Sequence, residues 1–439
     1  MAKAPAFAII TMDISLRDQQ VIWHPYTQAQ LSGPPIAIVR GEGVYLFDEA
    51  ENKYIDAVSS WWVNLHGHSH PHIASRVFVQ LQTLEHVIFA GFTHQPAVEL
   101  AERLLTILPG QAARIFYSDN GSTATEVAVK MSLQYWRNKG TPKKKIIAFE
   151  HAYHGDTFGA MSISARSGFT DAFADLLFDV IHIPLPLKGA ESQCIRELQR
   201  QISLNKDSIA AFIFEPLILG AGGMLMYEPQ VLDQLIRICT DNSILTIADE
   251  VMTGFGRTGK IFACDYLSST PDIVCMSKGI TGGTMAFGAT SCTDEIYSAF
   301  LSDDRSKTFF HGHSYTANPV ACAAALASFE LLAADECRQS ICRISARHKA
   351  FISRNSNSQH FKNLRSTGTI VAMEIETDEA SSYFHSLSTR LYTFFLDKGI
   401  ILRPLGNTLY IMPPYCISDE ELDLIYSAIE SLPKEWSLS

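Results

Sequence analysis

Short runs of consecutive apolar residues recur in the middle of the chain and alternate with segments that have helical spacing. The runs lie at 146–149, 209–214, 244–248, 273–276 and 288–292. Between two of them, residues 231–240 carry apolar side chains at the spacing of an amphipathic helix. Strands that are apolar throughout are typical of a parallel sheet that is covered on both faces. The pattern therefore predicts an α/β domain with a mostly parallel sheet.

The last hundred or so residues follow a different pattern. This part begins with an alanine-rich stretch at 318–332, which predicts a long helix. Further apolar runs and one more helical pattern follow at 370–375, 386–398 and 409–412. This order predicts a separate, smaller α+β unit. We expect three parts, namely an N-terminal segment of the small domain at 1–65, a large domain at 66–330 and the C-terminal small domain at 331–439.

Polar residues follow two of the predicted strands, where a parallel sheet usually carries its chemistry. Asp249 and Glu250 end one apolar run, and Lys278 ends another. Alone, an acid and a lysine at neighbouring strand ends are equally well explained as a structural ion pair. However, glycines at 279, 282 and 283 follow the lysine and allow a planar ligand to approach the backbone closely.

These residue types match the needs of an aldehyde cofactor with a pyridine ring. Such a cofactor needs a lysine as its covalent anchor and a carboxylate that keeps the ring nitrogen protonated. It also needs a phosphate site, and the small polar residues at 118–123 lead directly into a predicted helix at 126–136. The N–H groups at a helix N-terminus bind anions. Alone this segment would be only a helix cap, but with Lys278 and Asp249 it completes a predicted cofactor site.

Two other motifs suggest different chemistry. Residues 254–260 fit both common glycine-rich nucleotide loops, but Ile261 stands where a P-loop needs Ser or Thr, and no helix is predicted at the last glycine. Four histidines alternate at positions 66, 68, 70 and 72, which would suit a metal only with a further ligand. No Cys or Glu completes that set, and Gly67 and Pro71 favour a loop of ordinary histidines. We expect no metal site.

Composition narrows the possible partners. The chain has 439 residues, 47% hydrophobic and 18% charged, with a net charge of −11 and a mean hydropathy of +0.06. An acidic chain repels phosphodiester backbones, so nucleic acid is not an expected partner. Nine cysteines without a C-x-x-C pair favour reduced thiols in the cytoplasm. No apolar run approaches the ~20 residues that span a bilayer, so we expect no membrane association.

Residues 248–259 together with 277–279 resemble the signature of the class III aminotransferases. Further segments make the resemblance more specific, to those members that aminate 8-amino-7-oxononanoate with S-adenosylmethionine as donor. These segments are Trp23-His24-Pro25-Tyr26-Thr27, Ser59-Ser60-Trp61-Trp62, residues 153–162, Gly282-Gly283-Thr284-Met285, Arg403-Pro404 and Met412-Pro413-Pro414-Tyr415.

The resemblance implies a pyridoxal-phosphate-dependent enzyme of fold type I. The fold implied is a large domain with a mostly parallel seven-stranded sheet and a smaller α+β domain. By position, Lys278 would hold the cofactor and move the proton, and Asp249 would pair with the pyridine nitrogen. Gly121 and Ser122 would bind the phosphate, and Tyr153 would lie against the ring and the substrate.

The resemblance also implies a homodimer with its active sites at the subunit interface. His313 and Ser314 would reach across from the partner and complete the phosphate site, although many relatives have Pro-Thr there. Gly312, Trp62 and Arg403 would contact the substrate, and the Arg403 guanidinium would bind its carboxylate.

The remaining implied roles concern the donor and one departure from the family pattern. Asp156 would support the Tyr153 loop and contact the substrate, and Tyr26 would stack on the adenine of the donor. Leu219 stands where many relatives have Gln and cannot donate to the phenolic oxygen of the cofactor. The alternatives are another class III transaminase that acts on an ω-amino acid, the same acceptor with lysine as donor, or a protein that binds the cofactor without turnover.

Overall fold

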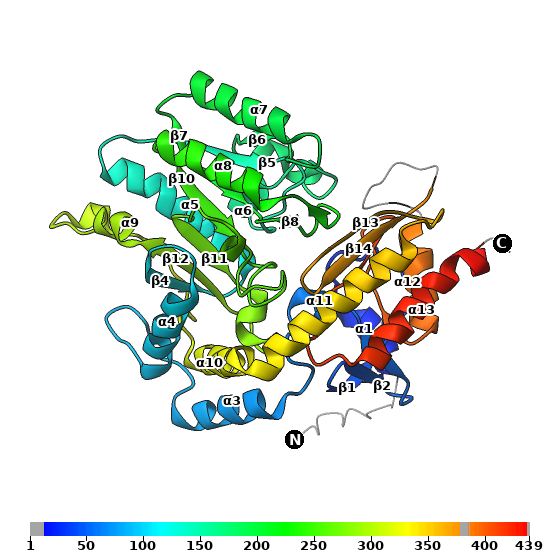
Figure 1. Cartoon of the computed structure of the whole chain (residues 1–439). Helices are drawn as coiled ribbons and strands as arrows, with labels where there is room; N and C mark the ends of the chain where they lie inside the picture. The colour runs from blue at the N-terminus through cyan, green and yellow to red at the C-terminus, as the bar shows by residue number, and fades with distance from the viewer. Residues whose placement is uncertain (1–12, 378–384, 386, 437–439) are drawn as a thin grey trace.

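The structure is a computed structural model that describes residues 13–377, 385 and 387–436, and the largest of its sheets has seven strands (Figure 1). The strand order is β4-β12-β11-β10-β7-β5-β6. In that order the strands span Ala112–Ser118, Gly288–Thr293, Ile273–Met276, Leu245–Asp249, Ile209–Phe214, Lys145–Phe149 and Ile181–Ile183. β12 runs antiparallel to both of its neighbours, and the other six strands run in the same direction. The predicted mostly parallel sheet is confirmed.

Alternate residues of these apolar strands enter two different cores, as the covered-sheet prediction requires. In β5, Ile146 and Ala148 pack with helix α5 (Gly121–Asn138). Ile147 and Phe149 belong to the larger core on the other face. The helices that contribute to that larger core include α4 (Gln95–Ile107), α7 (Glu191–Leu204) and α8 (Pro229–Asp241).

The alanine-rich stretch forms helix α10 (Pro319–Ala333), which is buried along most of its length. Small side chains let α3 (Pro71–Thr83) and α4 approach it closely, and it also packs on the turn η3 (Lys278–Thr281) that carries the lysine. The Asn318 side chain caps its first turn. The predicted helix is confirmed to within one residue.

Two smaller sheets form the remainder of the fold, together with helices at both ends of the described chain (Figure 1). One sheet joins β1 (Ile38–Glu42), β2 (Tyr45–Asp48), β3 (Lys53–Asp56) and β15 (Ile400–Ile401), and the other joins β13 (Phe361–Thr367), β14 (Ile370–Ile375) and β16 (Thr408–Ile411). Since β15 pairs with β3, the N-terminal segment shares a sheet with the C-terminal part. The division of the chain at residues 65 and 330 stays a prediction.

The other elements connect these units. They are α1 (Ile14–Val21), α2 (Ser59–Trp62), α6 (Phe158–Ile163), α9 (Asp294–Ser298), α11 (Asp335–Asn355), α12 (Leu387–Asp397), α13 (Asp419–Trp436), the hairpin β8 (Ile218–Leu219) and β9 (Leu225–Met226), and the 3-10 turns η1 (Asp171–Leu176), η2 (Ala263–Tyr266) and η4 (Arg305–Lys307). In the described part of the chain, no helix has the length and apolar character that crossing a membrane requires.

Candidate active site

The carboxyl ends of the parallel strands meet at one edge of the large sheet and carry the candidate chemistry. Asp249 is the last residue of β10, and Lys278 follows β11 after one residue. Glu215 follows β7 directly, and Tyr153 lies in the loop after β5. The strands β11, β10, β7 and β5 are successive neighbours in the sheet, so the four residues that follow or end them lie next to one another along this edge.

A cavity of about 350 Å³ lies at this edge. It is lined by Trp62, Asn120, Gly121, Ser122, Tyr153, His154, Gly155, Asp156, Thr157, Glu215, Asp249, Val251, Met252 and Lys278. Seven predicted site residues are thereby brought together, namely Trp62, Gly121, Ser122, Tyr153, Asp156, Asp249 and Lys278.

The Lys278 amine has a surrounding that favours its neutral form. Burial lowers its pKa from 10.5 to about 8, although the nearby carboxylates of Asp249 and Glu215 oppose that effect. The amine nitrogen lies 4.4 Å from the centre of the Trp62 ring. A lysine that is partly neutral near pH 8 can act as a nucleophile and as a base.

Asp249 is held by a histidine that the sequence analysis did not single out. Its Oδ2 atom lies 2.6 Å from Nδ1 of His154, and its Oδ1 atom accepts a hydrogen bond of 3.1 Å from the backbone N–H of Val251. Both side chains are buried. The other ring nitrogen of His154 has no hydrogen-bond partner in the described structure. The two contacts fix the direction of the Asp249 carboxylate, which belongs to the cavity lining.

Glu215 is a second buried carboxyl group in the cavity, and burial raises its pKa to about 7. It accepts backbone hydrogen bonds from Tyr153 (3.0 Å) and Gly220 (2.9 Å). It therefore joins the Tyr153 loop to the end of β7 and lies close enough to Lys278 to influence the charge on the amine.

The N-terminus of α5 closes one end of the cavity. Asn120 caps the helix, with a hydrogen bond of 2.9 Å from Thr123 N to its side chain. Gly121 and Ser122 are the first helical residues and line the cavity. The loop after β5 approaches so closely that a Cβ atom on Gly155 would lie 2.1 Å from Ser122 Oγ, so only glycine fits there.

These features suit pyridoxal phosphate. The cavity offers an amine of lowered pKa, an oriented carboxylate and the N–H groups of a helix N-terminus. Lys278, Asp249 and Ser122 would hold the aldehyde carbon, the ring nitrogen and the phosphate respectively. Leu219 is buried in β8 and does not line the cavity, so no donor to the ring comes from that position.

Tyr26 joins the site from the N-terminal segment. Its hydroxyl lies 3.2 Å from the hydroxyl of Tyr153 and donates to Asp156. Burial and the contacts with Tyr26 and Asp156 raise the pKa of the Tyr153 hydroxyl, which therefore stays protonated. The Tyr26 ring makes edge contacts with Trp61 (5.4 Å) and Phe169 (5.8 Å).

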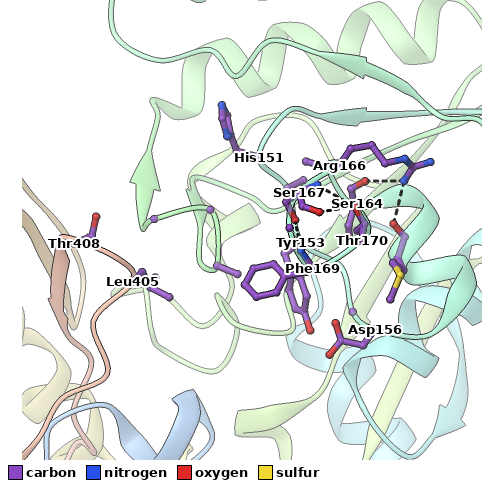
Figure 2. A pocket seen from close by; sticks show the side chains of 18 residues that line it. His151, Tyr153, Asp156, Ser164, Arg166, Ser167, Phe169, Thr170, Leu405 and Thr408 are labelled. Carbon is purple, nitrogen blue, oxygen red and sulfur yellow. Dashed lines mark hydrogen bonds between the residues drawn. The ribbon is translucent and has the colours of Figure 1, made fainter. Parts of the chain in front are cut away.

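A second cavity of about 310 Å³ adjoins the first and shares Tyr153, Gly155 and Asp156 with it (Figure 2). Phe169 belongs to its lining, and Leu405 of the C-terminal part faces it from the opposite side. The two cavities and the Tyr26 contacts give an extended site that runs from Lys278 toward the junction of the two parts.

The two tryptophans of the segment 59–62 point in different directions. Trp62 is buried beside Lys278, and its ring nitrogen donates a hydrogen bond of 3.0 Å to the Tyr410 hydroxyl. Trp61 is partly exposed, and the Arg403 guanidinium lies 4.6 Å from its ring centre. Arg403 lines neither cavity and adjoins the site through Trp61.

The predicted residues Gly312, His313 and Ser314 lie outside both cavities. Gly312 and Ser314 are exposed, and the segment is folded on itself by hydrogen bonds between His313 and Thr316. Within a single chain this segment does not reach Ser122's cavity.

The glycine-rich residues 254–260 and the four alternating histidines have structural explanations. Residues 254–260 form turns without a following α-helix, and Arg257 is buried within them. The histidines contact separate partners: His66 contacts Ser328, His68 contacts Asp56, and His72 contacts Glu330. Among the described residues, no group of three or more His, Cys, Asp or Glu side chains is arranged to hold a metal.

Three residues at the site were missed by the sequence analysis. Glu215 had the same signal as Asp249, a polar residue at the end of an apolar run, and could have been found by applying that rule to β7. His154 stood within a quoted motif but had no signal of its own. Phe169 lies in an irregular loop, and nothing in the sequence marked it.

Comparison with known proteins identifies the family. The family described as aminotransferase class-III matches residues 26–432. The adenosylmethionine-8-amino-7-oxononanoate aminotransferase of Synechococcus elongatus is 44% identical over 422 residues, which cover 94% of this chain and 98% of the relative. The protein of the same name from Geobacter sulfurreducens is 39% identical and covered to 95%, with 94% of this chain aligned.

Solved structures agree with this result. The crystal structure of the adenosylmethionine-8-amino-7-oxononanoate aminotransferase from Methanocaldococcus jannaschii superposes with a TM-score of 0.90 at 36% identity, covering 95% of this chain and 98% of the other. A PLP-bound amine transaminase from an uncultivated Pseudomonas species superposes with a TM-score of 0.87 at 29% identity, with coverages of 93% and 97%. The fold is therefore that of the pyridoxal-phosphate-dependent transaminases, and the chain belongs to the class III aminotransferases, among the relatives named adenosylmethionine-8-amino-7-oxononanoate aminotransferase.

Proposed function

We propose that this aminotransferase moves an amino group from S-adenosylmethionine to 8-amino-7-oxononanoate in biotin biosynthesis, with pyridoxal phosphate bound in the cavity of about 350 Å³. One observation carries the proposal for the cofactor. A lysine of lowered pKa, an oriented carboxylate and a helix N-terminus line one cavity. The full-length relatives carry the proposal for the substrates, because their names state both.

Lys278 performs the proton transfer in this proposal. When bound, pyridoxal phosphate supplies an aldehyde that accepts and returns the amino group, and a ring that withdraws electrons from the reacting carbon. The Lys278 amine, with a pKa of about 8, takes the proton from the substrate carbon and delivers it again on the cofactor side. Trp62, 4.4 Å away, excludes water from one side of that amine.

Asp249 holds the proton on the ring nitrogen. A carboxylate is needed there because a neutral group would not keep the pyridinium charged. His154, at 2.6 Å, prevents Asp249 from rotating away and partly offsets the cost of burying its charge. Gly121 and Ser122, at the N-terminus of α5, bind the phosphate.

The substrates differ in shape and are bound by different side chains. The acceptor is an apolar chain that ends in a carboxylate, which suits the Trp62 wall and a salt bridge with Arg403. The donor has an adenine ring and a sulfonium cation, both of which an aromatic face stabilises. Tyr26 supplies that face and is held in place by Tyr153 and Asp156. Phe169, in edge contact with Tyr26, extends the aromatic surface.

A homodimer completes the site in this proposal. Gly312 and Ser314 are exposed, and the segment that they enclose belongs to the phosphate site of the partner. Two exposed apolar side chains flank this segment in the sequence, Phe310 and Tyr315, and they supply apolar surface for an interface. Light scattering of the purified protein should give twice the mass of one chain. All nine cysteines are free, which suits a reducing cytoplasm.

The experiment that tests the function is a donor screen on the holoenzyme. S-adenosylmethionine, lysine, ornithine and 4-aminobutyrate are supplied in turn with 8-amino-7-oxononanoate, and 7,8-diaminononanoate is measured by mass spectrometry. We expect product with S-adenosylmethionine and none with the other donors. Product with lysine alone would assign a different donor, and turnover of 4-aminobutyrate without this acceptor would assign an ω-amino acid transaminase.

A further inference from the structure

The segment Ser59–Trp62 forms a left-handed helical turn, although it contains no glycine. All four residues have positive φ angles, of 50°, 45°, 75° and 72° in chain order. The turn is closed by hydrogen bonds from Trp62 N to Val58 O (2.8 Å) and from Val63 N to Ser59 O (2.9 Å). Side chains with a Cβ atom disfavour this conformation, so the surrounding structure must hold it.

At the start of the turn, the buried Asp56 carboxylate accepts hydrogen bonds from donor groups of the turn. Ser60 donates twice to Asp56, from the backbone N–H at 2.9 Å and from the hydroxyl at 2.6 Å. The ring of His68 contacts the same carboxylate at 3.0 Å. Burial alone would raise the pKa of Asp56, but the hydrogen bonds from His68 and Ser60 lower it, so the group stays ionised. A carboxylate at this end stabilises the N–H groups of a helical turn.

At the end of the turn, the buried Arg257 guanidinium binds the free carbonyl groups. It donates to Trp62 O at 3.3 Å, to Asn64 O at 3.0 Å and to Pro413 O at 2.9 Å. A negative group at the start and a positive group at the end match the dipole of the turn. The glycine-rich motif at 254–260 and one histidine of the alternating set thus serve the same short element.

This conformation sets the directions of both tryptophan rings. Trp62 points to the Lys278 amine, 4.4 Å from its ring centre, whereas Trp61 points to Arg403, 4.6 Å away, and to Tyr26. A right-handed or extended segment at 59–62 would direct at least one ring elsewhere, because successive side chains would leave the backbone at different angles.

We propose that Asp56 is a positioning residue that holds Ser59–Trp62 in the left-handed conformation, with His68 beside it and Arg257 at the other end of the turn. By holding this turn, Asp56 sets the recognition of a long-chain carboxylate substrate at Trp61, Trp62 and Arg403. The identity of that substrate rests on the proposed function, whereas the role of Asp56 in holding the turn does not.

The test compares two variants alone and together. Asp56→Ala removes the acceptor, and Ser60→Gly removes the side chain that disfavours a positive φ at this position. In the parent, Ser60→Gly loses the hydrogen bond from the Ser60 hydroxyl to Asp56 and should slightly weaken the binding of 8-amino-7-oxononanoate. In the Asp56→Ala background that bond is already absent, so glycine should improve binding. Asp48→Ala, which removes a partly exposed carboxylate from the neighbouring β2–β3 hairpin, is the matched control.

The readouts separate positioning from general damage. For Asp56→Ala we expect the KM for 8-amino-7-oxononanoate to rise roughly tenfold, in line with small displacements of binding groups. The kcat should stay within about threefold of the parent, and the visible absorbance of bound cofactor should be unchanged. Adding Ser60→Gly should reverse part of this rise in KM. Near-UV circular dichroism, which reports the surroundings of Trp61 and Trp62 without any substrate, should change in Asp56→Ala and return partly in the double variant.

An unchanged dichroism signal in a folded Asp56→Ala protein would overturn the inference, as would a double variant that is worse than Asp56→Ala. If Asp56→Ala does not fold, the pair Ser60→Ala and Ser60→Gly decides. Both variants lose the hydroxyl, but only glycine adopts a positive φ without strain. The Ser60→Gly variant should therefore have the higher kcat/KM, and the reverse order would overturn the inference. If the parent does not use 8-amino-7-oxononanoate, the proposed function fails, while the dichroism comparison still tests the turn.

Discussion

Replacing Trp62 with alanine should raise the pKa of the Lys278 amine. Burial lowers that pKa from 10.5 to about 8, and the Trp62 ring, 4.4 Å from the nitrogen, is one of the groups that exclude water. Water admitted by the smaller side chain would stabilise the ammonium form, which moves the pKa upward. The lost cation–π attraction acts in the opposite direction and is worth about 2 kcal/mol when desolvated, which is less than the roughly 3.4 kcal/mol that a shift from 10.5 to about 8 represents.

The size of the effect follows from the two pKa values. At pH 7, a lysine of pKa about 8 is neutral about 300 times more often than one of pKa 10.5. Restored hydration less the lost cation–π attraction leaves about 1.4 kcal/mol, which raises the pKa by about one unit and makes the neutral fraction at pH 7 about tenfold smaller.

The assay is the rate at which the apoenzyme captures pyridoxal phosphate covalently as a function of pH, because only the neutral amine reacts. The parent should reach half its maximal rate near pH 8, and Trp62→Ala should reach it near pH 9. Trp61→Ala is the matched control, since that ring faces Arg403 and should leave the midpoint unchanged. A parent midpoint near 10.5, or an unchanged midpoint in Trp62→Ala, would refute the assignment of the low pKa to burial beside Trp62.

Three further variants test the other roles. Lys278→Ala should bind the cofactor noncovalently and lose transamination by several orders of magnitude, and near-normal turnover would contradict the assignment. Asp249→Asn should weaken cofactor binding and slow proton abstraction by at least about 100-fold, because an amide does not hold the pyridinium proton; a parent rate, measured by loss of deuterium from labelled donor, would leave the acid a structural role only. Tyr26→Ala should raise the KM for S-adenosylmethionine far more than the Kd for the cofactor, and equal losses would show that Tyr26 only packs the N-terminal segment.

The large sheet was predictable because its strands are apolar throughout and separated by helices. This pattern leaves few arrangements open, and the rule for strand ends then located Asp249 and Lys278. The same rule applied to β7 would have found Glu215. The apolar stretch of α10 was predictable because a run of alanines has both a strong helix preference and a need for burial.

The left-handed turn at Ser59–Trp62 could not be predicted. Its residues have no preference for positive φ, and the groups that stabilise it, Asp56 and Arg257, are far apart in the sequence. His154 was missed for a related reason, since its role depends on a contact of 2.6 Å with a residue 95 positions later. Side chains that act through long-range contacts leave no local pattern.

The most direct measurement of the central claim is the first half-reaction. Holoenzyme is mixed with S-adenosylmethionine in the absence of acceptor, and the visible absorbance of the cofactor bound to Lys278 is followed by stopped flow. The proposed function predicts that this band disappears at a rate that saturates with the concentration of S-adenosylmethionine. Adding 8-amino-7-oxononanoate should then restore the band while 7,8-diaminononanoate is formed. A band that persists with S-adenosylmethionine but disappears with lysine or 4-aminobutyrate would contradict the proposed donor.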